Sequence, residues 1–438
     1  MTLATPITVI RGRFLDIQKT VSQAAEIADQ VRYLEDGVII TEQGKIRWFG
    51  TWNDAQDHLP INIEIQHYPE QLIIPGMIDT HIHFPQTEMV GAYGEQLLSW
   101  LNTYTFPTEI QFKNKAYASE IAKFFVNELL KNGTTTALVF CTVHPESVDA
   151  LFEAAEQHQM RLIAGKVMMD RHAPEALCDS ADSSYDDSKA LIEKWHGQGR
   201  ALYAITPRFA PTSTPEQLER AGQLKAEHPD VYVHTHLSEN KDEIAWVKDL
   251  FPAQKDYLDV YHHYGLTGNR SVFAHCVHLE DAEWQCMHET DSAIAFCPTS
   301  NLFLGSGLFP LKKTWQQQVK VGLGTDIGAG TSFSLLQTVN EAYKVQQLQG
   351  DKLSAFESLY HATLGGAKAL DLDNKLGNFN VGKEADFVVL NLKPTALQEL
   401  RQSRAKSLED SLFALFTMGD DRNIEATYIY GQKAYSQS

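Results

Sequence analysis

Short apolar runs alternate with longer amphipathic stretches through the middle of the chain. There are eight such runs, several with polar residues near their ends: 72–84, 135–143, 161–170, 202–210, 231–239, 271–279, 292–301 and 319–328. Nearly continuous Val, Ile, Ala and Leu are typical of strands buried on both faces. Stretches such as 117–132 and 241–251 have helical spacing. Because eight strand–helix repeats form a closed parallel sheet, we predict an α/β fold with a (β/α)8 TIM-type barrel.

The two ends of the chain follow a different pattern. Residues 37–50 alternate in polarity and turn at a glycine, as a β-hairpin does. Residues 382–392 and 424–436 have the same short-strand character. We therefore expect both termini to build one small β-sandwich domain beside the barrel. The predicted domain limits are 1–72 and 371–438 for the two parts of the sandwich, and 73–370 for the barrel.

Composition excludes several classes of protein. The 438-residue chain is 43% hydrophobic, enough for a large core, and its net charge of −19 would repel nucleic acid. Its five cysteines have no C-x-x-C spacing, which argues against a disulfide scaffold and a thiolate zinc site. No run reaches the roughly 18 apolar residues of a membrane helix, and no signal peptide is apparent. We expect a soluble, cytoplasmic protein that binds neither nucleic acid nor membrane.

Histidines occur at the predicted strand ends. His81 and His83 are two apart on the first strand, so both side chains point to one face, at the mouth of the barrel. His236 ends the fifth strand, His275 lies in the sixth, and Asp326 ends the eighth. Strand ends are neighbours around a barrel rim, so these groups can converge. Imidazoles and a carboxylate in this arrangement are typical ligands of a catalytic metal ion.

Three residues near these ligands have alternative interpretations. His234 shares the inward face of His236 and is a second candidate ligand. Asp79 is expected to be a partner of a ligand histidine rather than a ligand itself. Glu239 is either a catalytic group or only a neighbour of a helix N-cap.

The chain resembles the amidohydrolase superfamily over nearly its whole length. The motifs PG-x-x-D-x-H-x-H, H-x-H-L-S-E, a histidine on the sixth strand, G-T-D and a closing G-x-x-x-x-G-K-E-A-D-F-V-V-L occur in order. Within the superfamily it most resembles the guanine deaminase family, through 83-HFPQ-86, 100-WLNTYTFPTE-109 and 207-PRF-209. The resemblance implies deamination of guanine, a small-molecule substrate, to xanthine. It also implies a homodimer.

The same resemblance implies a metal site that holds one ion. It implies zinc bound by His81, His83, His236 and Asp326, and iron is the alternative because nitrogen and oxygen ligands accept both. Relatives with two ions place a bridging lysine at the end of the fourth strand, where this chain has Arg208 and no lysine. We expect one ion per chain, which would lower the pKa of its water to ~7.

Proton transfer in this chemistry is expected to involve three residues. Glu239 would protonate ring nitrogen N3 and the departing ammonia as a general acid/base. Asp326 would accept the proton of the water, and His275 would orient and stabilise the hydroxide.

Four residues are predicted to bind guanine. Gln86 offers an acceptor and two donors, Arg208 would hold the O6 carbonyl, and Phe209 would lie against the purine. Trp100 lies in the long aromatic connection 85–109, which we expect to form a pocket wall or lid. The alternatives are that Arg208 pairs with a carboxylate and that Phe209 only packs. We expect adenine to be a poor substrate, because a site built to pair with O6 rejects analogues without it.

Two other functions remain open from the sequence. A related amidohydrolase would deaminate cytosine, an adenosine derivative or a triazine. A non-catalytic scaffold on the same fold would usually lack metal ligands, whereas all the expected ligands are present here.

Overall fold

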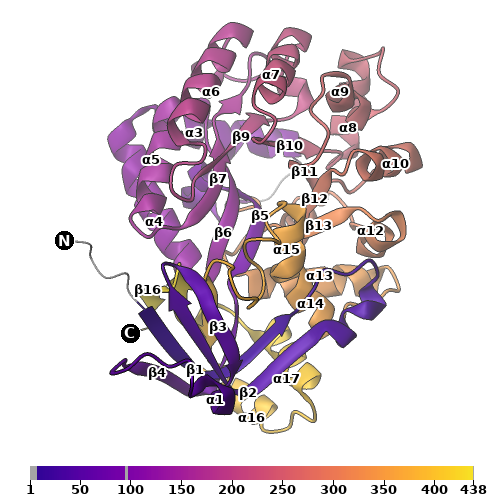
Figure 1. The fold of residues 1–438 in the computed structure, drawn as a ribbon. Helices are drawn as coiled ribbons and strands as arrows, with labels where there is room; N and C mark the ends of the chain where they lie inside the picture. Colours follow the sequence, from indigo (N-terminus) through magenta and orange to yellow (C-terminus); the bar gives the residue numbers. More distant parts are fainter. Residues whose placement is uncertain (1–6, 94–96, 438) are drawn as a thin grey trace, which may run out of the picture.

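Eight strands from the middle of the chain pair in parallel around a barrel (Figure 1). The computed structural model describes residues 7–93 and 97–437. Each barrel strand lies beside those that precede and follow it in the sequence, which confirms the predicted barrel. The strands are β5 (Met77–His83), β6 (Thr134–Phe140), β7 (Arg161–Gly165), β9 (Leu202–Pro207), β10 (Tyr232–Leu237), β11 (Ser271–His275), β12 (Ala293–Phe296) and β13 (Lys320–Leu323). A two-residue strand, β8 (Val167–Met168), adds to β9.

Hydrogen bonds join the first and last barrel strands. The Thr80 hydroxyl of β5 donates to the Leu323 carbonyl of β13 at 3.0 Å. Beyond β13, the backbone N–H of Asp326 donates to the carbonyl of His81 at 2.9 Å. These bonds hold the end of β13 against the end of β5, where the predicted ligands lie.

The barrel interior is closed at its amino-terminal base. All seven residues of β5 are buried, as expected of a strand with two covered faces. Inward-facing residues such as Ile78 pack in one apolar cluster with Leu370 and Leu372, which follow α15 (Leu364–Ala369). The Tyr232 hydroxyl donates to the Leu370 carbonyl at 2.5 Å. With its base filled, the barrel can receive a ligand only at the carboxyl ends of its strands.

Helices cover the outside of the barrel (Figure 1). Side-chain caps begin several of them; Asn240, for example, accepts the Asp242 N–H and forms a capping box with Glu243. The helices of this layer are α4 (Lys115–Lys131), α5 (Pro145–Glu156), α6 (Ala181–Trp195), α7 (Pro215–Glu227), α8 (Lys241–Leu250), α9 (Tyr257–His263), α10 (Asp281–Glu289), α12 (Leu311–Gln317), α13 (Leu335–Leu348) and α14 (Ala355–Ala362). None of the helices in the described ranges is both long and apolar enough to cross a membrane.

Both termini contribute to a second sheet below the barrel (Figure 1). Its strands are β1 (Ile7–Ile17), β2 (Val31–Glu42), β3 (Lys45–Thr51), β4 (Ile65–Pro75), β14 (Phe387–Leu390), β15 (Ile424–Ile429) and β16 (Gln432–Ser436). They form one mixed seven-stranded sheet in the order β16-β15-β14-β4-β1-β2-β3. The predicted hairpin is β2–β3, which turns at Gly44 with a φ of +73°. Helices α16 (Ala396–Gln402) and α17 (Leu408–Met418) lie between β14 and β15 in the sequence.

The long connection after β5 is largely helical. It contains α2 (Leu97–Trp100), a π-helical turn (Leu101–Thr105) and α3 (Phe106–Glu109). Residues 94–96 of the predicted segment lie outside the described residues. A π-helical turn inside a helix is rare and is found mostly near functional sites.

Candidate active site

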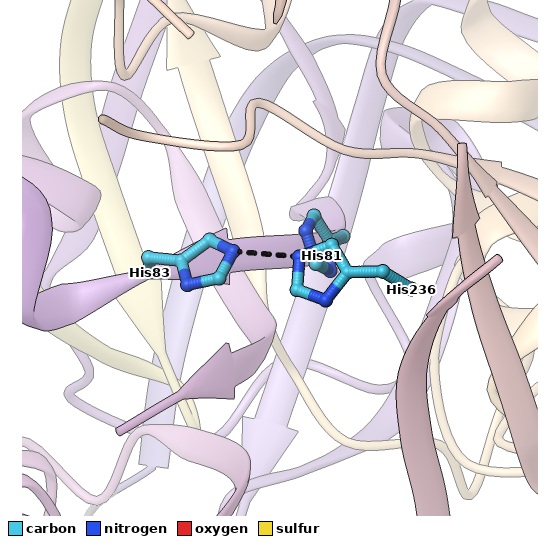
Figure 2. Close-up of side chains that lie close together, drawn as sticks. All are labelled: His81, His83 and His236. Carbon is cyan, nitrogen blue, oxygen red and sulfur yellow. Dashed lines mark hydrogen bonds between the residues drawn. The ribbon is translucent and has the colours of Figure 1, made fainter. Parts of the chain in front are cut away.

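All four predicted metal ligands meet at the carboxyl ends of the barrel strands. His81 and His83 come from β5, His236 from β10, and Asp326 follows β13. Nε2 of His83 lies 3.2 Å from Nε2 of His236, a contact drawn dashed in Figure 2. Asp326 Oδ1 lies 3.2 Å from His81 Nε2 and 3.3 Å from His83 Nε2. Strands far apart in the sequence therefore bring these donor atoms to a common point.

Hydrogen bonds fix the direction of the imidazole rings. Nδ1 of His236 lies 2.7 Å from the Arg208 carbonyl oxygen. A carbonyl only accepts, so Nδ1 carries the ring proton and the Nε2 lone pair faces His83. Nδ1 of His81 lies 2.7 Å from Nε2 of His234, which leaves Nε2 of His81 directed at the cluster. The alternative ligand His234 is thus placed as a ring partner of His81.

The donor atoms fit a single metal ion. Zinc–nitrogen bonds of about 2.0–2.1 Å in a tetrahedron put neighbouring ligand atoms about 3.3 Å apart, close to the observed 3.2 Å between His83 and His236. Within the described residues, Nε2 of His81 is buried and has no hydrogen-bond partner. Such an atom is costly unless a ligand satisfies it. Burial holds the pKa of all three histidines well below the usual range, in the neutral form that binds metals.

Asp79 binds backbone groups rather than the ring of a ligand histidine. Its Oδ1 accepts the N–H groups of His81 and Thr325, both at 3.1 Å, and its Oδ2 accepts the Thr325 hydroxyl at 2.5 Å. Asp79 is thus a partner of His81, as expected, but through the His81 backbone, because Nδ1 of the ring pairs with His234. Asp79 instead fastens the loop that carries Asp326 to strand β5.

The three residues expected to transfer protons are also close together. Glu239 Oε2 lies 3.5 Å from His275 Nε2, which is 3.8 Å from Asp326 Oδ2. The Ser306 hydroxyl donates to Glu239 Oε1 at 3.1 Å. Burial raises the pKa of Glu239 to about 8, and it raises the pKa of Asp326 to about 6. Carboxyl groups with a pKa near neutrality can both release and accept a proton, although a bound cation would lower these values.

Left-handed backbone accompanies these side chains. Ser238, His275, Cys276 and Asp326 have φ values of 49°, 72°, 52° and 52°. Non-glycine residues rarely adopt this conformation, which costs on the order of 1 kcal/mol or more per residue. The backbone at three strand ends is thus held in unfavourable conformations at the point where the functional side chains converge.

A cavity opens beside the cluster. About 430 Å³ of space, including the open mouth, lies between the atoms that line it. Among the predicted site residues, His81 alone does not line it, because it lies beneath the others. The lining comprises His83, Gln86, Leu97, Trp100, Leu101, Arg208, Phe209, His236, Glu239, Glu243, His275, Leu304, Asp326 and Ala329.

The long connection forms an apolar wall of this cavity. Leu97 and Trp100 of α2 and Leu101 of the π-helical turn line it, opposite polar groups from the barrel strands. These residues and Phe209 belong to one apolar cluster, separate from the barrel core. Flat aromatic and aliphatic surfaces of this kind suit a planar ligand.

Glu109 is a buried carboxylate beside the cavity to which the sequence analysis assigned no role. It is fully buried at the end of α3, where its Oε2 accepts from Nη1 of Arg208 at 2.8 Å. Its Oε1 accepts from Nε2 of Gln86 at 3.2 Å. Arg208 therefore pairs with a carboxylate, which was the alternative role given to it, and it also lines the cavity. The sequence did contain a signal for Glu109, because this residue is the last one of the aromatic motif 100–109.

Glu243 is a second buried carboxyl group without a predicted role. Its Oε2 accepts the backbone N–H groups of Glu239 and Asn240 at 3.0 and 3.1 Å, and its Oε1 accepts the Tyr257 hydroxyl at 2.8 Å. Asn240 is the N-cap of α8, so Glu239 is the neighbour of an N-cap, as its alternative interpretation expected. The three-residue spacing of Asn240 and Glu243 is the signal of a capping box that could have been recognised.

Known proteins share both the sequence and the fold. Residues 72–434 match the amidohydrolase family. The chain is 61% identical to the guanine deaminase of Escherichia coli (strain K12), over 99% of this chain and 98% of that protein. The chain belongs to the amidohydrolase family, among its guanine deaminases. Amidohydrolases generally use a metal, and the described residues of this amidohydrolase include two overlapping groups of candidate ligands: His81, His83 and His236, and His81, His275 and Asp326.

Solved structures of guanine deaminases agree with this amidohydrolase fold. The E. coli guanine deaminase structure superposes with a TM-score of 0.96 at 59% identity, covering 99% of this chain and 100% of the other. The C. acetobutylicum guanine deaminase, solved with bound guanine in the active site, superposes with a TM-score of 0.88 at 32% identity, covering 98% of this chain and 100% of the other.

Proposed function

We propose that this protein hydrolyses guanine to xanthine and ammonia in the cavity beside the histidine cluster. The observation that carries the proposal is that one cavity holds both the convergent ligand atoms and the polar pair Gln86 and Arg208. The similar E. coli protein is a guanine deaminase, and the similar C. acetobutylicum protein binds guanine. A small, planar, polar substrate suits a cavity with these walls.

One zinc ion is the proposed cofactor, and iron remains the alternative for the same donors. Its ligands would be His81, His83, His236 and Asp326. When bound, the ion supplies hydroxide at neutral pH by lowering the pKa of a water molecule.

Guanine would lie with C2 towards the cluster and its ring between the apolar walls. Arg208 would donate to O6, and Gln86 would accept from N1–H. Phe209 and Trp100 would cover the purine and exclude water from it. These contacts would place the carbon that loses its amino group next to the proton-transfer residues.

The carboxyl groups of Asp326 and Glu239 would carry the protons in this reaction. In the overall reaction a C2–O bond replaces the C2–N bond, and the two protons of water end on N3 and on ammonia. Asp326 would accept the first proton of the water, and Glu239 would give its own proton to N3. Glu239 would then take the proton of the C2 hydroxyl group and give it to the departing amine, and the proton held by Asp326 would return to Glu239. His275, 3.5 Å from Glu239 Oε2, would orient the attacking oxygen.

Three further properties are proposals that rest on resemblance or on sequence. They are a homodimer, a cytoplasmic location, and domain limits at 72/73 and 370/371. The mass of the protein in solution tests the first of these directly.

The proposed reaction is tested by measuring ammonia release from guanine, adenine and cytosine, with the metal counted on the same sample. We expect rapid release from guanine and about 10⁴-fold less from adenine, since adenine lacks O6. Release from cytosine alone would mean a different aminohydrolase. A pure sample without stoichiometric metal or turnover, even after reconstitution with zinc or iron, would favour a non-catalytic scaffold.

A further inference from the structure

Glu109 connects the two polar residues that face the ligand cavity. Its carboxylate is fully buried, while Gln86 and Arg208 are each 3% exposed. One oxygen accepts from the Gln86 amide and the other from the Arg208 guanidinium. Glu109 itself is not among the residues that line the cavity. It is therefore placed to act through its two neighbours rather than on a ligand directly.

The contacts of Gln86 fix which way its amide group faces. A carboxylate has no proton to donate, so the NH₂ end of the Gln86 amide must face Glu109. On its other side the amide packs over Gly328, where a Cβ atom would lie 2.0 Å from Gln86 Oε1. Gly328 has a φ of +121°, a conformation that favours glycine. Contacts on two sides thus determine the orientation of this amide.

Arg208 is held at both its backbone and its side chain. Its carbonyl oxygen accepts from the Thr235 hydroxyl at 3.2 Å, as well as from the His236 ring. Its guanidinium lies 5.6 Å from the centre of the Phe106 ring and pairs with Glu109 through Nη1. A guanidinium has five N–H groups, so this pairing leaves donors for a ligand.

We infer that Glu109 is a positioning residue that makes the cavity select 6-oxopurines over 6-aminopurines. The inference rests on the proposed function. With its NH₂ end held by Glu109, Gln86 offers its carbonyl oxygen as an acceptor, and Arg208 offers only donors. Guanine presents N1–H beside the O6 acceptor, which complements this pattern. A 6-aminopurine presents an N1 acceptor beside an N6 donor, the reverse pattern, and leaves buried polar groups unpaired.

The test compares guanine with 2,6-diaminopurine in the metal-loaded enzyme. Both purines carry the 2-amino group that would be lost, and they differ only at the N1–C6 edge. In Glu109→Gln the new amide can donate as well as accept, so Gln86 can turn over. We expect the ratio of kcat/KM for guanine to that for 2,6-diaminopurine to fall by about 10- to 100-fold, as for the loss of a hydrogen bond to a charged group.

Glu88→Gln is the matched control, because Glu88 is an exposed carboxylate in the same connection whose partner is the Tyr117 hydroxyl. We expect it to leave the ratio unchanged. A purely structural defect would lower both activities together, whereas the inference requires their ratio to change. Gly328→Ala is the second variant: it pushes Gln86 from the opposite side, keeps the Glu109–Arg208 pair, and should lower the ratio as well.

The outcomes separate the inference from the proposed function. If wild type releases no ammonia from guanine, the proposed function fails. If wild type deaminates guanine but the ratio is unchanged in metal-loaded Glu109→Gln, the inference about Glu109 is overturned and the proposed function stands. Should Glu109→Gln not fold, Glu109→Asp, whose shorter side chain cannot reach both Gln86 and Arg208, is measured in its place, and an unchanged ratio there overturns the inference.

Discussion

Buried carboxyl groups have opposite pKa shifts at the two ends of the barrel. At the base, Arg161 and Arg200 both bind the carboxylate of Glu384, and Arg200 also binds Asp386. Burial alone would raise the pKa of Glu384, but the two arginines hold this pKa at about 2. At the mouth, burial instead raises the pKa of Glu239 to about 8. The carboxylates at the base are paired with arginines, whereas Glu239 and Asp326 at the mouth lie beside histidines.

This difference separates a structural charge cluster from a functional one. Arg161 and Arg200 belong to the barrel, whereas Glu384 and Asp386 belong to the C-terminal segment, so the base cluster fastens the second sheet to the barrel. The mouth cluster brings possible ligand atoms of several residues to one point and has left-handed backbone. Such an arrangement is unfavourable by itself, and a bound cation would satisfy it. The charged groups at the mouth thus serve ligand binding, and those at the base serve stability.

The largest effect is expected at the metal ligands. His83→Ala removes a nitrogen that lies 3.2 Å from His236 and 3.3 Å from Asp326. We expect loss of stoichiometric metal and a fall in turnover of ~10³-fold or more. Metal analysis measures the loss of metal, and ammonia release measures the fall in turnover. His288→Ala, at an exposed histidine, should retain metal and activity; equal metal retention by both variants would exclude His83 as a ligand.

Glu239→Gln should separate chemistry from metal binding. The variant keeps the size of the side chain and removes its ability to transfer a proton. We expect the metal count to stay unchanged and kcat for guanine to fall ~10²–10⁴-fold. Normal turnover of this variant would show that another group carries the proton.

At the base the expected effect is on stability alone. Glu384→Gln leaves Arg161 without its charged partner, and breaking a buried pair costs about 3–5 kcal/mol. Denaturant unfolding at neutral pH measures this loss, while metal content and purine preference should not change. Glu35→Gln, at an exposed position of the same sheet, should change the free energy of unfolding by less than about 0.5 kcal/mol.

The pH dependence of the base cluster gives a further check. The pKa of Glu384 is about 2 in the folded protein against an ordinary value of 4.5, so its stabilisation is present above pH 4.5 and is lost as pH falls towards 2. The stability difference between wild type and Glu384→Gln should therefore shrink over that interval. A difference that is constant from pH 5 to pH 2 would mean that charge pairing is not its cause.

The smallest predicted effect is on the orientation of Glu239. Ser306→Ala removes the hydroxyl that donates to Glu239 Oε1 at 3.1 Å. A single such bond contributes about 0.5–1.5 kcal/mol, so kcat should fall about two- to tenfold with the metal count unchanged. A larger loss would indicate that Ser306 also contacts the substrate.

The fold and the metal cluster could be predicted because their signals are local. Buried parallel strands appear as continuous apolar runs, and residues two apart on a strand share a face, so His81 and His83 could be assigned together. The hairpin at Gly44 follows from the same kind of pattern. Helix limits were close as well: 241–251 was predicted, and α8 spans Lys241–Leu250.

Partners across the barrel could not be predicted, because no local pattern encodes them. Asp79 and His234 both bond to His81, one through the backbone and the other through the ring, and spacing does not distinguish these roles. Glu109 and Arg208 are 99 residues apart and meet only because α3 folds over the end of β9. The sequence by itself determined which residues would stand at the strand ends. Only the tertiary structure decided which of them touch, since contacts between distant segments depend on how the whole barrel closes.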